Sequence, residues 1–157
     1  MKMATREDIT APIEAVFEHL ADFDGFERAA MRRGAEVARI DALSAAGPGM
    51  AWHVGFSYRG RARKANIELA DFDAPERIRA MVASTGVDME LVVELVAMSR
   101  SRTRMNLSLD LRPRTIPARM MVQSLKLARQ TVLKRFRQRV GDYAADLEAR
   151  VQTAGAG

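Results

Sequence analysis

Residues 50–112 carry the clearest pattern in the chain, an alternation of apolar and polar positions with a period of two. Successive strand residues point to opposite faces of a sheet, so this alternation predicts strands with one apolar and one polar face. Short turn segments such as "DAPER" separate the runs, which favours an antiparallel meander. The predicted strands cover residues 50–59, 62–72, 77–84, 87–95 and 104–112.

Shorter elements precede this meander. Residues 2–9 predict a strand, and residues 11–23 predict a helix in which Pro12 suits the first turn. The apolar positions of that helix fall on one side, at Ile13, Val16, Phe17 and Leu20. A second short helix over residues 24–34 and a strand over residues 35–43 lead into the alternating region.

After "PRTIP" the period changes to that of a helix, which is expected to run from about residue 118 to about residue 150. Its apolar positions are Met121, Leu125, Ala128, Val132, Phe136, Tyr143 and Leu147. A sheet with one apolar face needs a cover, and only this helix is long enough to lie across it. The sequence therefore predicts an α+β fold with the order β-α-α-β(5-6)-α, its curved antiparallel sheet wrapped around one long C-terminal helix.

Length and composition fit one domain. The chain has 157 residues and 48% hydrophobic residues, enough for a core, and the expected domain covers residues 1–150 with a flexible tail at 151–157. There are no cysteines, which excludes disulfides and thiolate chemistry. The first residues lack the apolar region of a secretory leader, so we expect a cytoplasmic protein.

Charge is distributed unevenly along the chain. Residues 1–99 carry 12 Lys and Arg against 16 Asp and Glu, whereas residues 100–139 carry 12 basic residues against Asp110 alone. Lys126, Lys134 and Arg137 fall away from the apolar stripe of the expected helix. The basic segment is either a solubilising face or a docking surface for nucleic acid or anionic lipid. It lacks the interleaved aromatic residues that single-strand binders use, so nucleic acid is the less favoured partner.

Few residues suit catalysis. The only histidines, His19 and His53, fall on a helix and on the polar side of a strand, so no metal site and no cofactor are expected. No nucleotide-binding or nucleophile motif occurs. Tyr58, at the end of an apolar strand face, is the one plausible proton donor, and no catalytic residue is assigned.

Two local stretches resemble a known superfamily. The stretch "ITAPIEAVFEHLADFDGFERAAM" is similar to the opening of START-like (SRPBCC) proteins, and "ADFDAPERIRAMV" is similar to their strand–turn–strand segment. This superfamily of helix-grip folds includes START lipid-transfer domains, pathogenesis-related plant proteins, polyketide cyclases and aromatase/cyclases. The chain lacks the Trp-Pro pair that often follows the first helix there, so the entrance to its cavity is expected to differ.

The resemblance implies a cavity between the sheet and the C-terminal helix, suited to a small hydrophobic ligand. Arg129, within about 60° of Leu125, Val132 and Phe136 on an ideal helix, could meet an acidic head group, or instead extend to the rim or pair with an acidic residue of the first helices. The same apolar residues could instead fill the core. The expected ligand-binding residues are Trp52, Phe56, Tyr58, Met89, Met105, Leu107, Met121, Leu125, Ala128, Arg129 and Val132.

Three functions fit these observations. The first is binding or carriage of a small lipophilic molecule, with an acidic head group as one option. The alternative is an enzyme resembling polyketide cyclases and aromatases, acting on a hydrophobic substrate in the same cavity. The third is weak docking of the basic segment on an anionic membrane surface. The sequence assigns no oligomeric state.

Overall fold

Seven strands form one antiparallel sheet in the spatial order β1-β7-β6-β5-β4-β3-β2. The computed structural model describes residues 1–156. Every strand pair is antiparallel, and neighbours from β2 to β7 follow each other along the chain, which confirms the predicted meander. The strands are β1 (Lys2–Ile9), β2 (Glu36–Arg39), β3 (Ala51–Tyr58), β4 (Arg61–Asp73), β5 (Arg77–Ser84), β6 (Val87–Ser99) and β7 (Arg102–Pro113).

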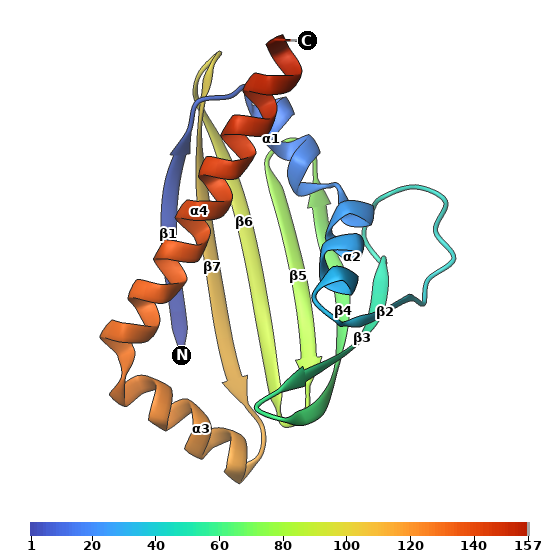
Figure 1. Ribbon diagram of the computed structural model, residues 1–157, viewed down its shortest axis with the longest axis vertical. Coiled ribbons are helices and arrows are strands. Elements are labelled where there is room, and N and C mark those ends of the chain that lie inside the picture. The colour runs from blue at the N-terminus through green and yellow to red at the C-terminus, as the bar shows by residue number, and fades with distance from the viewer. Residues whose placement is uncertain (157) are drawn as a thin grey trace.

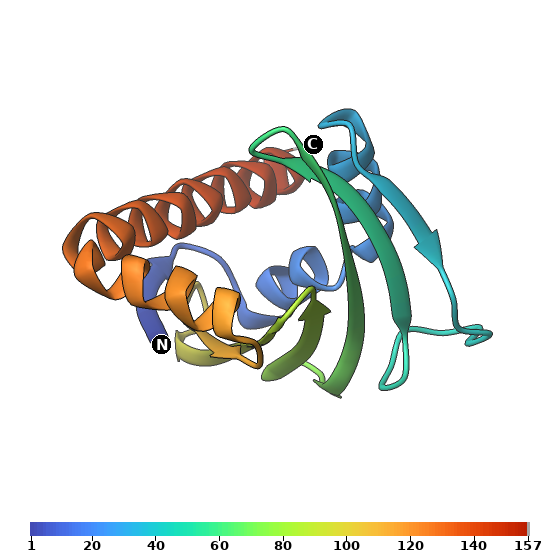
Figure 2. The same cartoon turned by 90° about the horizontal axis from the view of Figure 1, so that it is seen from below.

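The helices lie on one side of this sheet. They are α1 (Ile13–Leu20), α2 (Phe23–Arg32), α3 (Ile116–Leu127) and α4 (Arg129–Ala156). The sheet curves toward them, so that its concave face is the helix side (Figures 1 and 2). Within residues 1–156 no helix combines the length and the apolar character needed to cross a membrane.

The C-terminal helical region is two helices and not the single helix predicted from the sequence. The break falls at Ala128, whose φ of −100° and ψ of 25° lie outside the helical range. The two helices point in different directions from this residue (Figure 1). Helix α4 also continues to Ala156, so most of the segment expected to be a flexible tail, residues 151–157, is helical; Gly157 lies outside the described residues.

Helix α4 lies along β1 and against α1, at one margin of the sheet and not across its middle (Figure 1). The approach is close at Gly141, where a Cβ would lie 3.1 Å from Oε1 of Glu7 on β1. Val140, Ala144 and Leu147 on the same side of α4 are buried in the main core. The edge strand β1 is thereby covered by the helix.

Helix α2 covers the opposite margin, α1 lies between α2 and α4 at one end of the sheet (Figure 1), and aromatic packing holds both. The ring of Phe17 lies 5.2 Å from that of Phe72, and the ring of Phe23 lies 5.5 Å from that of Trp52. The indole Nε1 of Trp52 also donates a hydrogen bond of 2.6 Å to Oε1 of Glu27 on α2. These contacts fix α2 over β3, the last long strand before the β2 edge.

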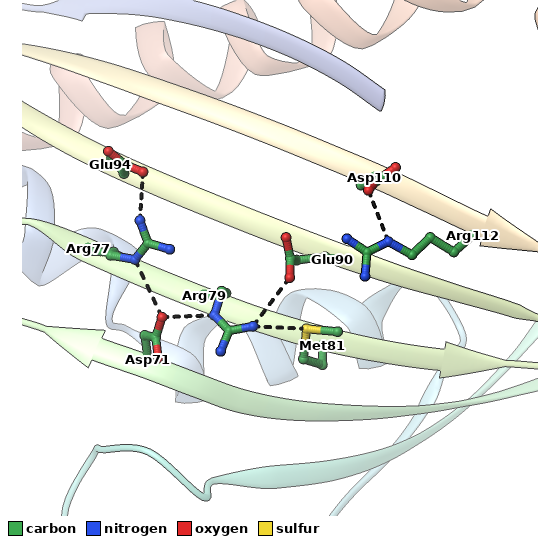
Figure 3. A network of polar contacts seen from close by, with 8 residues as sticks. All are labelled: Asp71, Arg77, Arg79, Met81, Glu90, Glu94, Asp110 and Arg112. Atoms are coloured by element: carbon green, nitrogen blue, oxygen red, sulfur yellow. Dashed lines mark hydrogen bonds and ion pairs between the residues drawn. The ribbon is translucent and has the colours of Figure 1, made fainter. Parts of the chain in front are cut away.

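The convex face carries ion pairs where the concave face carries apolar side chains. Figure 3 shows the network, in which Arg77 bonds Glu94 at 2.7 Å and Arg79 bonds Asp71 at 2.8 Å and Glu90 at 3.3 Å. Such partly exposed pairs contribute little each. Their presence keeps this face hydrated and leaves the concave face as the only large apolar surface of the sheet in residues 1–156.

The packing of α4 predicts a difference between two leucines of the C-terminal region. Leu147 is 2% exposed in the core, whereas Leu127 at the end of α3 is 92% exposed. We expect Leu147→Ala to lower the free energy of unfolding by about 2–5 kcal/mol because it leaves a cavity. The matched variant Leu127→Ala should change it by less than about 0.5 kcal/mol. Urea denaturation measures both, and equal losses would contradict this placement of the two helices.

A carboxylate at the top of β1 predicts a pH dependence of stability. Asp8 accepts hydrogen bonds from Arg104 at 2.9 Å and from Arg102 at 3.0 Å, and these lower its pKa from 3.8 to about 2. A carboxylate with a lowered folded-state pKa stabilises the fold above its unfolded pKa and loses that contribution as the pH falls through the folded pKa.

The variant Asp8→Asn removes this contribution. It should unfold at a lower urea concentration than the wild type at neutral pH, and the gap should close as the pH falls from about 4 to about 2. Urea midpoints measured across that range test it. A gap that stays constant down to about pH 2 would show that the two arginines do not act on Asp8 in solution.

Candidate ligand-binding site

The middle of the concave face is less covered than its margins. One buried cluster joins α1 and α4 to the strands, and a second, smaller cluster lies under α3 and contains Met3, Val87, Leu111 and Ala118. Val82 and Leu91, at the centre of the sheet, belong to neither cluster and are only half-buried. An apolar floor therefore lies between two packed margins.

The register of the sheet shows how this floor is built. One row of neighbouring concave-face residues runs across the strands as Leu69, Ala80, Leu91, Leu109 and Met3. Leu69 and Met3, at the two ends of the row, are 2% and 8% exposed, whereas the three central residues are half-buried. The next row has the same form and consists of Trp52, Ile67, Val82, Met89 and Leu111. A concave, apolar, partly exposed surface is the usual setting for a lipophilic ligand.

Four of the eleven predicted ligand residues lie on or beside this floor. Met89 and Leu107 are half-buried on β6 and β7, and Leu125 and Val132 are half-buried on α3 and α4. Trp52 and Met105 are on the same face of the sheet, but at 6% and 0% exposure they form part of the packed core. The sequence could not separate core residues from lining residues because both occupy the same alternating positions.

Three predicted residues lie at the end of the molecule formed by α3 and the β3–β4 hairpin. Phe56 and Tyr58 on β3 are 36% and 51% exposed, and Met121 on α3 is 44% exposed. The Cζ atom of the Arg59 guanidinium lies over the Tyr58 ring, 5.4 Å from the ring centroid. These side chains are thus on the rim, and Tyr58 is largely in water.

The predicted positions of Ala128 and Arg129 are wrong. Both residues are exposed, at the junction between α3 and α4. The angular position predicted for Arg129 assumed one continuous helix through Ala128, and the helix is broken at that residue. Arg129 therefore does not face the apolar floor.

Arg63 is the basic residue that the sequence analysis missed. It pairs with Phe56 across β3 and β4 and has the same strand parity as the buried Ala65, so it belongs to the concave face. Its Nε atom is buried and has no hydrogen-bond partner within residues 1–156. A buried guanidinium nitrogen normally has an acceptor, and this one has none among the described residues. Its parity with Ala65 and Ile67 was the signal present in the sequence.

His53 and Tyr143 are two other ionisable groups that could exchange a proton. His53 lies on the convex face, where its Nδ1 contacts Oδ1 of Asn66. Tyr143 of α4 packs near Phe26, and burial raises the pKa of its phenol to about 12, so the hydroxyl stays neutral. In the part of the chain that the structure describes, no three His, Asp or Glu side chains are placed to hold a metal ion.

Two depressions lie on the convex face. They measure about 560 and 320 Å³; Arg6, Glu94 and Arg137 line the first, and the second combines apolar residues such as Ile40 and Met81 with Glu68, Asp88, Glu90 and Arg112. Glu94 in the first is bonded to Arg77, and Glu90 in the second is bonded to Arg79. The concave floor remains the better candidate because it is apolar.

Comparison with protein-family models and with curated proteins finds no match to the sequence. Solved structures match over almost the whole chain. The aromatase/cyclase Zhui from Streptomyces sp. R1128 is 18% identical with a TM-score of 0.68, covering 99% of this chain and 98% of that one. A START superfamily protein from Mycobacterium smegmatis is 14% identical with a TM-score of 0.61, covering 98% of each chain.

A norcoclaurine synthase from Thalictrum flavum is 10% identical with a TM-score of 0.63, covering 93% of this chain and 94% of that one. These identities are too low to transfer a reaction or a ligand, but similarity over the full length establishes the architecture. The strand order, the two N-terminal helices and the C-terminal helix agree with the resemblance found in the sequence. The protein has an α+β helix-grip fold, the fold that it shares with these solved structures.

Proposed function

We propose that the protein binds a small lipophilic molecule over the middle of the concave face, with an anionic oxygen of that molecule directed to Arg63. The observation that supports this most is the pair of register rows whose ends are buried and whose centres are half-buried. Val82, Leu91 and Leu109 lack a complete cover from the protein's own side chains. A ligand on this floor would supply it.

The energetics of such a complex are favourable. Burial of one methylene group contributes about 0.8 kcal/mol, so a chain of about twelve carbons supplies up to roughly 10 kcal/mol. Loss of ligand freedom offsets part of this. A net free energy near −8 kcal/mol corresponds to a dissociation constant of about 1 μM, which is the affinity that we expect.

Arg63 supplies polarity at one end of the floor. Its Nε is buried without an acceptor, and Arg59, Arg61 and Lys64 lie close to it along the hairpin, with no acidic residue between Arg59 and Lys64. A carboxylate or phosphate near this hairpin would gain a charge-assisted hydrogen bond and a favourable potential. Arg63 thus takes the role that the sequence analysis gave to Arg129.

Catalysis on a hydrophobic substrate, the alternative from the sequence, would use the same floor. The proton donor expected for it, Tyr58, is 51% exposed and lies under Arg59. Binding requires only apolar cover and one charge, and both are present. For this reason binding, and not catalysis, is the function that we propose.

Filling the floor tests where the ligand lies. Ala80 is half-buried at the centre of a concave row, and Ala83 on the same strand pairs with Asn66 and is exposed on the convex face. Ala80→Trp should weaken binding of dansyl-undecanoic acid at least about tenfold, because the indole occupies the ligand's space. Ala83→Trp should bind as the wild type does. Fluorescence titration gives both affinities, and a folded Ala80→Trp protein with normal affinity would refute the proposed position.

A second pair of variants tests the polar end. Arg63→Gln should weaken binding of undecanoic acid about tenfold or more, the usual effect of losing a charged hydrogen bond, and should leave undecanol binding unchanged. Lys64→Gln, one residue away and exposed, should alter neither ligand much. Displacement of the dansyl probe measures all four combinations. Equal losses for acid and alcohol would mean that Arg63 has a structural role only.

A further inference from the structure

Helix α3 has apolar side chains on two opposite sides. Ala118 and Val122 on its inner side are 6% and 2% exposed, and with the half-buried Leu125 they face the core cluster under α3. Thr115 caps the helix by accepting a hydrogen bond of 3.3 Å from the backbone N–H of Ala118. The inner side therefore anchors α3, and the fold does not need the apolar residues of its outer side.

The outer side is nonetheless apolar. Ile116, Met120 and Leu127 are 73%, 68% and 92% exposed. At about 100° per residue these three positions fall within about 40° of one another and form one stripe. Three large apolar side chains aligned in water on an otherwise well-packed helix mark an interaction surface.

Basic residues border this stripe. Arg119 and Lys126 lie about 60–80° from Ile116 on the helix, and both are exposed. Neither side chain forms an ion pair within residues 1–156. By contrast, the neighbouring Arg112 and Arg114 form ion pairs with Asp110 and Asp88, respectively. From residue 112 to residue 140 the chain has nine basic residues and no acidic one. One side of the stripe is therefore bordered by positive charge.

A second surface of the same kind lies at the same end of the molecule. The hairpin between β3 and β4 reaches the end at which α3 lies (Figures 1 and 2). It carries the exposed Phe56 and Tyr58 together with Arg59 and Arg61. Exposed apolar side chains next to unpaired cations occur in both segments.

We propose that α3 docks on an anionic lipid bilayer, with Ile116, Met120 and Leu127 inserted among the lipids and Arg119 and Lys126 near their phosphates. Apolar burial and attraction to anionic headgroups together bind an amphipathic helix at a membrane surface. This interaction surface goes beyond the proposed ligand binding and does not depend on it.

Other partners fit the surface less well. In a symmetric dimer the same patch meets itself, so the α3 helices of two copies would bring their positive borders together without any acidic partner. Nucleic acid would match the charge, but a phosphate backbone gives no place for three large aliphatic side chains. A bilayer with anionic headgroups matches both properties.

Vesicle co-sedimentation of the full chain without added fatty acid tests the proposal. The probes are vesicles of phosphatidylcholine alone and of phosphatidylcholine with about one third phosphatidylglycerol. We expect binding to the anionic vesicles, at least about tenfold weaker binding to the neutral ones, and a marked decrease as salt rises from about 0.05 M to about 0.5 M.

Variants separate the two contributions. Met120→Gln with Leu127→Gln should weaken vesicle binding at least about tenfold, and Arg119→Gln with Lys126→Gln should weaken it about fivefold per residue. The matched control is Val96→Gln with Met98→Gln on β6, since these two residues are 49% exposed and distant from α3. The control should bind as the wild type does, and circular dichroism should show all variants folded.

Three results would overturn the proposal. The first is unchanged vesicle binding by the Met120→Gln and Leu127→Gln protein. The second is light scattering that shows a wild-type dimer which this variant converts to a monomer, because the stripe would then be a subunit interface. The third is tight binding to duplex DNA at physiological salt without vesicle binding.

Discussion

The apolar side chains of seven antiparallel strands all need cover on one curved face, and the helices leave part of the middle of that face half-exposed. Helix α4 covers β1, α3 covers the end of β7, and α2 covers the opposite margin through Phe23 and Trp52. Helix α1 packs against β6, β7 and α4 at one end of the sheet. Two neighbouring rows of the sheet are therefore buried at their ends and half-buried at their centres. The candidate site follows from this distribution of cover, not from a catalytic motif.

The break at Ala128 determines where the cover lies. It allows α4 to run along β1, where Gly141 lies close to Glu7, while α3 turns aside over the second core cluster. A single straight helix could not pack against both places. The same break leaves the outer side of α3 and Arg129 exposed to water. Basic residues of this segment, such as Arg119 and Lys126, are therefore accessible to a partner.

The sequence predicted the sheet well because alternation with a period of two directly reflects which face each residue occupies. It did not predict the break, because neither Gly nor Pro stands at residues 127–129 and the apolar spacing continues through them. The inward positions predicted for Ala128 and Arg129 required a continuous helix and are therefore wrong. Arg63 has the same strand parity as Ala65, so the alternation places both side chains on the concave face. The prediction of that face used apolar residues only and therefore left Arg63 out.

The most direct test of the account is an NMR titration of methyl-labelled protein with dodecanoic acid. Methyl signals of Val82, Leu91 and Leu109 should shift together and saturate with one affinity, because these half-buried side chains form the proposed floor. Signals of Val16 and Leu147, which are buried in the packed margin, should move little. Saturable shifts confined to α3, with Val82 and Leu91 unmoved, would contradict a binding site on the concave face.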